Sequence, residues 1–257
     1  MNELQICNLG MVFGGIRALT DVSLSVRAQE FRGIIGPNGS GKTTLFNCIS
    51  GFYLPTSGNV VFRGDHITRL TPHEIVQLGI VRTFQTVNLF KDLSLLDNVL
   101  IGFHHTLKHS NLFEIIMRSR RNCREEKEKR EKARELLQDV GINESVEMKA
   151  RSLPYGKQKS LEIARALATQ PKVLMLDEPA SGLNPSEVGT LRELLQGIHG
   201  GGVTIVLIEH HMELVMQTSE RVTCLDYGRI IAEGSPQEVA ENPQVVEAYL
   251  GKRENRA

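Results

Sequence analysis

Nine residues near the start of the chain constrain its fold more than any other stretch. Residues 36–44 read GPNGSGKTT and fit the pattern G-x-x-x-x-G-K-[ST]. The glycines allow the backbone to adopt positive φ and wrap around an anion, so that successive N–H groups point at a phosphate beside a helix N-terminus. The apolar run 31–35 predicts a buried strand before the loop, and residues 45–50 predict a helix after it. This context indicates a phosphate-binding loop.

Each position of the loop has an expected role. The Lys42 side chain supplies positive charge for the β and γ phosphates of a nucleotide, and the Thr43 hydroxyl is a candidate Mg²⁺ ligand. A glycine-rich turn that ends in lysine by chance is the alternative, but it does not account for the flanking strand and helix. The predicted nucleotide contacts in the loop are Gly36, Asn38, Gly39, Ser40, Gly41, Lys42, Thr43 and Thr44.

Composition sets the broad class of protein. The chain has 257 residues, of which 40% are hydrophobic, enough for one large domain with an insertion. Thirty basic residues balance thirty acidic ones, so the overall charge gives no reason to expect a nucleic-acid partner. The four cysteines are scattered and form no C-x-x-C pair, which predicts free thiols in a reducing compartment. No signal segment or run of about 18 apolar residues is recognised, so we expect a cytosolic protein unless a partner holds it at a membrane.

The residues before the loop alternate between apolar and polar types on both sides of a Gly14-Gly15 turn, which predicts two or three antiparallel strands. Phe13 precedes the turn, and its ring is a candidate to stack on a nucleotide base; packing in the core or against the turn is an equal alternative. Residues 71–74 predict an N-capped helix start with a capping box. Residues 79–85 predict a strand that ends at the polar Gln85.

Helical periodicity replaces strand-like runs over residues 88–152, which predicts an inserted helical subdomain. Within it, residues 124–135 read REEKEKREKARE, with opposite charges three and four positions apart. A docking surface is one interpretation of this run, and a solvated helix face is the favoured one.

Two carboxylates follow an apolar run in the second half of the chain. Residues 173–176 predict a central parallel strand that places Asp177 and Glu178 at its carboxyl end, where ligands bind in open α/β sheets. Asp177 is a candidate Mg²⁺ ligand, and Glu178 is placed to orient and deprotonate an attacking water. An acidic surface turn is the alternative, which the phosphate loop upstream disfavours. After a further strand at 203–208, His210 is a candidate to contact a γ-phosphate or the water, although taken alone it fits a structural or exposed histidine better.

Five motifs in this order resemble the ATP-binding subunits of ATP-binding cassette (ABC) transporters over essentially the whole chain. They are the Walker A loop at 36–44, a Q-loop at 83–85, a signature-like LPYGK at 153–157, the Walker B run ending at 177–178, and a switch histidine at 210. The predicted fold class is α/β: a single domain over 1–257 with a P-loop NTPase (RecA-like) core, an N-terminal antiparallel β subdomain and the inserted α-helical subdomain at about 88–152.

The resemblance assigns roles that spacing alone does not. It implies that Gln85 contacts Mg²⁺ and links the site to membrane subunits, and that Phe13 stacks on adenine. Tyr155 and Gly156 of the signature loop would complete the ATP site of a partner subunit in a head-to-tail dimer. The implied catalytic residues are Lys42, Glu178 and His210, and the implied metal ligands are Thr43, Gln85 and Asp177.

Two departures from the family pattern stand out. Pro154 replaces the usual signature serine and removes a hydroxyl donor to the γ-phosphate. The D-loop, residues 180–185, ends in Asn184-Pro185 where aspartate is usual.

The resemblance also extends to a branch of the family, the importers of branched-chain amino acids. The similar stretches are RTFQ at 82–85, LEIARAL at 161–167, IEH at 208–210 and EAYLG at 247–251, whereas His211 stands where that branch commonly has aspartate. This implies a peripheral protein on the cytoplasmic side of the cell membrane that uses ATP and Mg²⁺. Its implied partners are a second ATPase subunit, identical or related, two transmembrane permease subunits and, indirectly, a periplasmic or extracellular solute-binding protein, with no nucleic acid.

Three alternatives remain at this point. In the first alternative, the protein serves a transporter of urea, an amide or another amino acid. The second is a soluble ABC protein that acts on nucleic acid or the ribosome, which usually has two cassettes or a long coiled-coil insertion. The third is a small-molecule kinase, which leaves the signature loop and His210 unexplained.

Overall fold

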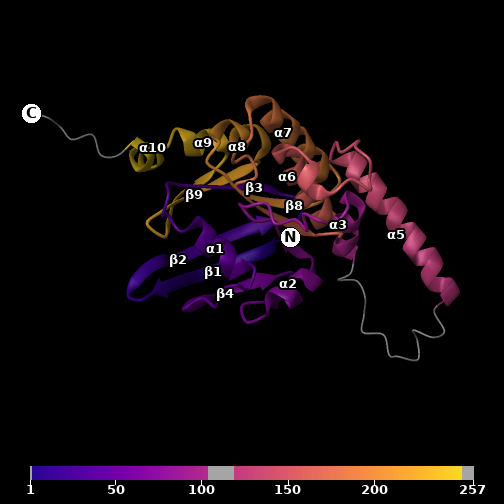
Figure 1. Ribbon diagram of the computed structural model, residues 1–257. Coiled ribbons are helices and arrows are strands. Elements are labelled where there is room, and N and C mark those ends of the chain that lie inside the picture. The colour runs from indigo at the N-terminus through magenta and orange to yellow at the C-terminus, as the bar shows by residue number, and fades with distance from the viewer. Residues whose placement is uncertain (1, 104–118, 251–257) are drawn as a thin grey trace, which may run out of the picture.

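The computed structural model describes residues 2–103 and 119–250 and contains two β-sheets with helices packed around them (Figure 1). A four-stranded antiparallel sheet has the order β2-β1-β4-β5, and a six-stranded sheet has the order β10-β9-β3-β8-β7-β6. The strands are β1 Asn2–Phe13, β2 Ile16–Arg27, β3 Phe31–Ile35, β4 Ser57–Phe62, β5 Asp65–His66, β6 Ile80–Arg82, β7 Val173–Asp177, β8 Thr204–Ile208, β9 Arg221–Asp226 and β10 Arg229–Gly234. The fold is therefore α/β, as predicted.

The helices connect and cover these sheets. They are α1 Lys42–Ile49, α2 Pro72–Leu78, α3 Leu95–Gly102, α5 Ser119–Asp139, α6 Tyr155–Leu167, α7 Pro185–Gly200, α8 Met212–Thr218, α9 Pro236–Ala240 and α10 Pro243–Leu250, with a 3₁₀ turn at Ala150–Ser152. Helix α1 packs into one hydrophobic cluster with residues of both sheets, so it holds them together. Among the described helices, none combines the length and the hydropathy needed to cross a bilayer.

The parallel part of the larger sheet positions the site. Strands β3, β7 and β8 are buried at every residue, as expected for parallel strands covered on both faces. Strand β8 pairs with β3 on one side and β7 on the other, with Ile208 opposite both Ile34 and Asp177. This register brings the carboxyl ends of all three strands to one edge. The phosphate loop follows β3 at that edge, Glu178 follows β7, and Glu209 follows β8.

The strand expected at 79–85 is shorter than predicted. Gly79 is the C-cap of α2 with a φ of 102°, and β6 ends at Arg82. Strand β6 lies at the edge of the sheet, where it pairs with β7, and directly after it Thr83 N donates to Met175 O at 2.9 Å. Gln85 therefore lies in a loop beyond the sheet. The capping box predicted at residues 71–74 is present.

Helices α3, α5 and α6 share a separate hydrophobic cluster that runs from Leu89 to Ala168. It includes Leu161 and Ala164 of α6, beyond the expected insertion limit of 152, and that boundary stays a prediction. The charged run lies on α5, where the described side chains from 125 to 135 are exposed or half-buried except Ala133. The solvated-face interpretation fits this exposure.

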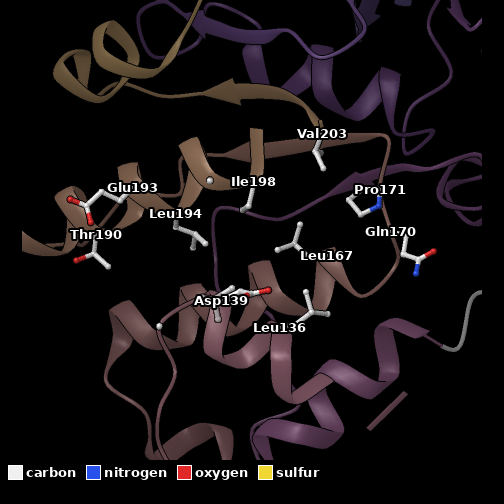
Figure 2. Close-up of a pocket in the computed structure, with 13 residues that line it drawn as sticks. Leu136, Asp139, Leu167, Gln170, Pro171, Thr190, Glu193, Leu194, Ile198 and Val203 are labelled. Atoms are coloured by element: carbon white, nitrogen blue, oxygen red, sulfur yellow. The ribbon is translucent and has the colours of Figure 1, made fainter. Parts of the chain in front are cut away.

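A cavity of about 760 Å³ separates the end of α5 from α7. Figure 2 shows Leu167, Leu194 and Ile198 pointing toward one another across it, with Asp139 and Glu193 nearer its margin. The end of α5 and the second half of α7 are therefore separated by a space with a largely apolar lining.

Candidate nucleotide site

The phosphate loop adopts a backbone that requires glycine at two positions. Gly36 has a φ of 147° and Gly41 a φ of 105°. A Cβ atom on Gly36 would lie 2.1 Å from the Leu225 carbonyl oxygen, and one on Gly41 would lie 2.7 Å from the Ala18 carbonyl oxygen. The loop is thus packed closely against β9 on one side and β2 on the other, which fixes its path.

The Lys42 ammonium lies at the centre of this loop. Its Nζ donates hydrogen bonds to the carbonyls of Gly36 at 2.7 Å and Pro37 at 2.8 Å. Burial lowers the pKa of Lys42, and the nearby Glu178 carboxylate partly offsets this effect. The loop therefore presents a cation, held by its own backbone, where the phosphates are expected.

The three predicted metal ligands line one cavity of about 440 Å³, which contains Thr43, Gln85 and Asp177. Hydroxyl, amide and carboxylate oxygens are the hard donors that Mg²⁺ prefers, so the donor set fits this ion. Six further residues line this cavity, among them Asn47, Arg82 and Phe84. In the described ranges, this site included, no group of three or more His, Cys, Asp or Glu side chains gathers to hold a metal.

Arg82 also lines this cavity, although no motif in the sequence gave it a role. Its Nη2 donates to Asp177 Oδ2 at 2.7 Å and its Nη1 to Asn47 Oδ1 at 2.6 Å. The guanidinium also lies 5.4 Å from the ring centroid of Phe46 and 5.2 Å from that of Phe84. Arg82 thus connects the Walker B aspartate, the phosphate-loop helix and the Q-loop. Its position at the carboxyl end of a predicted strand, directly before the Q-loop, is the sequence feature that could have indicated a place at this site.

Three of the predicted residues meet at one carboxylate oxygen. Gln85 Nε2 donates to Glu178 Oε2 at 2.7 Å, and His210 Nδ1 lies 3.6 Å from the same oxygen. The Glu178 backbone has a φ of 48°, and its N–H donates to the Ile208 carbonyl at 2.9 Å. The sheet edge therefore holds a carboxylate between an amide and an imidazole, an arrangement that suits the orientation of a water molecule.

Glu209 also lacked an assigned role and is fully buried. Its Oε1 accepts a hydrogen bond from Ala180 N at 2.7 Å, and its Oε2 accepts from the backbone N–H groups of His210 and His211 at 3.0 and 3.1 Å. The side chain therefore joins the loop after β7 to the loop after β8. A carboxylate directly after a buried parallel strand is the same signal that marked Asp177.

The signature loop lies at the start of α6, with Pro154 as N-cap and no side-chain cap. A Cβ on Gly156 would lie 2.5 Å from Glu187 Oε1, so α6 closely approaches α7. Lys159 Nζ donates to the Glu178 carbonyl at 3.2 Å. Neither Tyr155 nor Gly156 lines the two cavities at the chain's own phosphate loop.

Phe13 ends β1, and its side chain is partly exposed. Its ring lies edge-on to Tyr53, with centroids 5.3 Å apart. This contact leaves both interpretations of Phe13, base stacking and turn packing, in place.

A phosphate loop between a central strand and a helix, with two carboxylates at the end of a nearby strand, defines a P-loop nucleotide-binding protein. The family model described as ABC transporter matches residues 19–181, and the one described as branched-chain amino acid ATP-binding cassette transporter matches residues 229–255. The chain belongs to the ABC transporter ATP-binding family. It is accordingly a transport ATPase that binds ATP.

Individual relatives agree with this assignment. The chain is 43% identical, over 97% of its length and 98% of the relative's, to the high-affinity branched-chain amino acid transport ATP-binding protein LivG of Salmonella typhimurium. It resembles the solved ADP conformation of an ATP-binding cassette of an ABC transporter, with a TM-score of 0.84, 35% identity and coverage of 98% and 100%. It also resembles a dimeric, post-hydrolysis cassette bound to ADP and phosphate, with a TM-score of 0.76, 27% identity and coverage of 91% and 98%.

Proposed function

We propose that the protein hydrolyses ATP to power an importer of branched-chain amino acids. The observation that carries this substrate class is the full-length identity of 43% to a transport protein of that description. The match of residues 229–255 to the branched-chain cassette model supports it independently of the motifs. Urea, other amides or other amino acids remain the alternative solutes.

The site residues divide the reaction between them. Backbone N–H groups of the loop and the Lys42 ammonium bind the phosphates of ATP, and Glu178 accepts a proton from the attacking water. His210 contacts the γ-phosphate, and the amide of Gln85 orients the Glu178 carboxylate. Mg²⁺, held by Thr43, Gln85 and Asp177, would neutralise charge that develops on the phosphates. The ring of Phe13 stacks on the adenine.

Two copies of the cassette, or this chain and a related one, are required for a complete site. The N–H groups at the start of α6, at Tyr155 and Gly156, are free of a side-chain cap and suit an anion. Because these residues lie away from the chain's own phosphate loop, we assign them to the γ-phosphate bound by the partner subunit. The dimeric relative bound to ADP and phosphate supports this arrangement.

Two permease subunits are the proposed membrane partners, and they would place the protein on the cytoplasmic face of the membrane. Phe52 and Leu54 are exposed, and the Phe52 ring centroid lies 5.7 Å from that of Phe84 in the Q-loop. An exposed apolar group next to Gln85 suits a partner whose movement must reach the site. A solute-binding protein would contact the permeases and not this chain.

Uptake in reconstituted vesicles tests the proposal. The chain is purified with its two permease subunits and a solute-binding protein, and ATP-dependent uptake of labelled leucine is compared with that of labelled urea. We expect leucine uptake that is abolished by Glu178→Gln. Uptake of urea alone would overturn the substrate class, and co-sedimentation with ribosomes instead of permeases would overturn the transport role.

A further inference from the structure

The C-terminal helix returns to the phosphate loop. The Tyr249 hydroxyl on α10 accepts a hydrogen bond from the backbone N–H of Gly36 at 2.8 Å. Helix α10 is anchored by Val245, which packs in a hydrophobic cluster with Ile35 at the end of β3 and Cys224 of β9. A residue 213 positions later in the chain thus contacts the first residue of the Walker A motif.

Loss of the hydrogen bond to Tyr249 would leave the buried N–H group of Gly36 without this partner. The residue is buried, and a buried backbone N–H without a partner costs about 1–3 kcal/mol. Its carbonyl oxygen accepts the 2.7 Å hydrogen bond from Lys42 Nζ. One residue therefore connects the Tyr249 hydroxyl with the ammonium group that faces the phosphates.

The hydrogen bond between Gly36 and Tyr249 lies next to a cavity, and its hydroxyl carries no charge. A cavity of about 630 Å³ lies beside it, lined by loop residues 37–40 and by Gln244, Glu247 and Ala248 of α10. Burial raises the pKa of Tyr249 to about 12, so the hydroxyl is neutral at physiological pH. The loop and α10 are thus joined by a neutral hydrogen bond at the margin of an open space.

We propose that Tyr249 is a positioning residue of the nucleotide site: its hydroxyl fixes the Gly36 peptide, and with it the carbonyl that holds Lys42. ATP affinity then depends on the docking of α10. This role rests on the nucleotide site proposed above, and it extends that site to the C-terminal region.

Substitution of Tyr249 by phenylalanine removes the hydroxyl and keeps the ring. We expect Tyr249→Phe to raise the Kd for a fluorescent ATP analogue and the KM for ATP by about threefold to tenfold, as for the loss of one hydrogen bond. The kcat at saturating ATP stays within about twofold, because Glu178 and His210 are untouched. A purely structural role would lower the Tm of the nucleotide-free protein and leave the Kd unchanged.

Tyr227→Phe is the matched control, because Tyr227 lines the same cavity with a side chain that is 86% exposed. Its Kd is expected to equal that of the unmodified protein. A wild-type Kd in Tyr249→Phe, or an equal loss in both variants, would overturn the inference. If the unmodified protein bound no ATP, the nucleotide site itself would be wrong, so the two failures are distinguishable.

Discussion

The Arg82 guanidinium and the Asp177 carboxylate form an ion pair with an N–O distance of 2.7 Å, and both side chains are at most 5% exposed. Removal of one partner from a buried pair typically costs about 3–5 kcal/mol, because the other charge is left unpaired. This pair therefore ties the end of β6, directly before the Q-loop, to the Walker B strand and constrains the proposed metal ligand.

The more conservative Arg82→Lys change keeps the charge and loses the forked contact to Asp177 and Asn47. We expect kcat for ATP to fall at least about tenfold and the free energy of unfolding by about 1–3 kcal/mol. Steady-state kinetics and urea denaturation measure the two effects. Arg134→Lys on the exposed face of α5 is the control; equal behaviour of both variants would remove any special role from Arg82.

Pro154→Ser restores a hydroxyl to the start of the signature helix. Serine at an N-cap stabilises a helix by about 0.5–2 kcal/mol relative to residues that cannot cap, and here it would add a donor for the partner's γ-phosphate. We expect ATPase activity to rise and to saturate at a lower protein concentration. Pro236→Ser, at the first turn of α9, serves as control and is expected to have no effect. If Pro154→Ser left the ATPase rate unchanged, the backbone N–H groups at the start of α6 would be sufficient to contact the partner's γ-phosphate without a side-chain hydroxyl.

Gly197→Ala is expected to stabilise the protein. Gly197 lies inside α7 and lines the cavity beside α5, and an added Cβ would meet no heavy atom within 4 Å. Alanine at an interior helical position gains about 0.5–1 kcal/mol over glycine. The opposite sign is expected for Gly102→Ala, whose Cβ would lie 2.3 Å from the Arg165 carbonyl oxygen. Thermal unfolding of both variants checks the pair, and a lower Tm for Gly197→Ala would contradict the account of this cavity.

The burial of two cysteine thiols is expected to make the free energy of unfolding depend on pH in the alkaline range. Burial raises the pKa of Cys48 and Cys224 from 9.0 to about 11. The pKa of each thiol is therefore higher in the folded protein than in the unfolded protein. The contribution of the buried neutral thiol to the free energy of unfolding is complete below pH 9 and is lost as the pH rises through about 11. Each thiol then accounts for about 2–3 kcal/mol.

Cys224→Ala should therefore flatten the fall in unfolding free energy between pH 9 and about 11. The exposed Cys7 is the control site, since Cys7→Ala removes a thiol that folding does not bury. Denaturant titrations across this range measure the slope. Parallel slopes in the two variants would contradict the assigned burial effect.

Local signals in the sequence predicted those parts of the fold that depend on neighbouring residues. The phosphate loop, the apolar strand before Asp177 and the capping box at Thr71 each rest on a few adjacent positions. Arg82 and Glu209 gained their roles only from the register that aligns β6, β7 and β8, because their partners lie 95 and 29 residues away along the chain. The strand at 79–85 was overestimated because apolar content does not mark where an edge strand loses its pairing partner.

In the proposed reaction, Glu178 accepts the proton from the attacking water while the rest of the site holds ATP between two subunits. Glu178→Gln keeps the shape of the side chain and removes its basicity. The decisive measurement is ATP turnover by this variant together with its mass in solution, by size-exclusion chromatography with light scattering, in ATP and Mg²⁺. We predict turnover reduced at least about a hundredfold and a stable ATP-bound dimer. Wild-type turnover, or a variant that stays monomeric with ATP bound, would contradict the account.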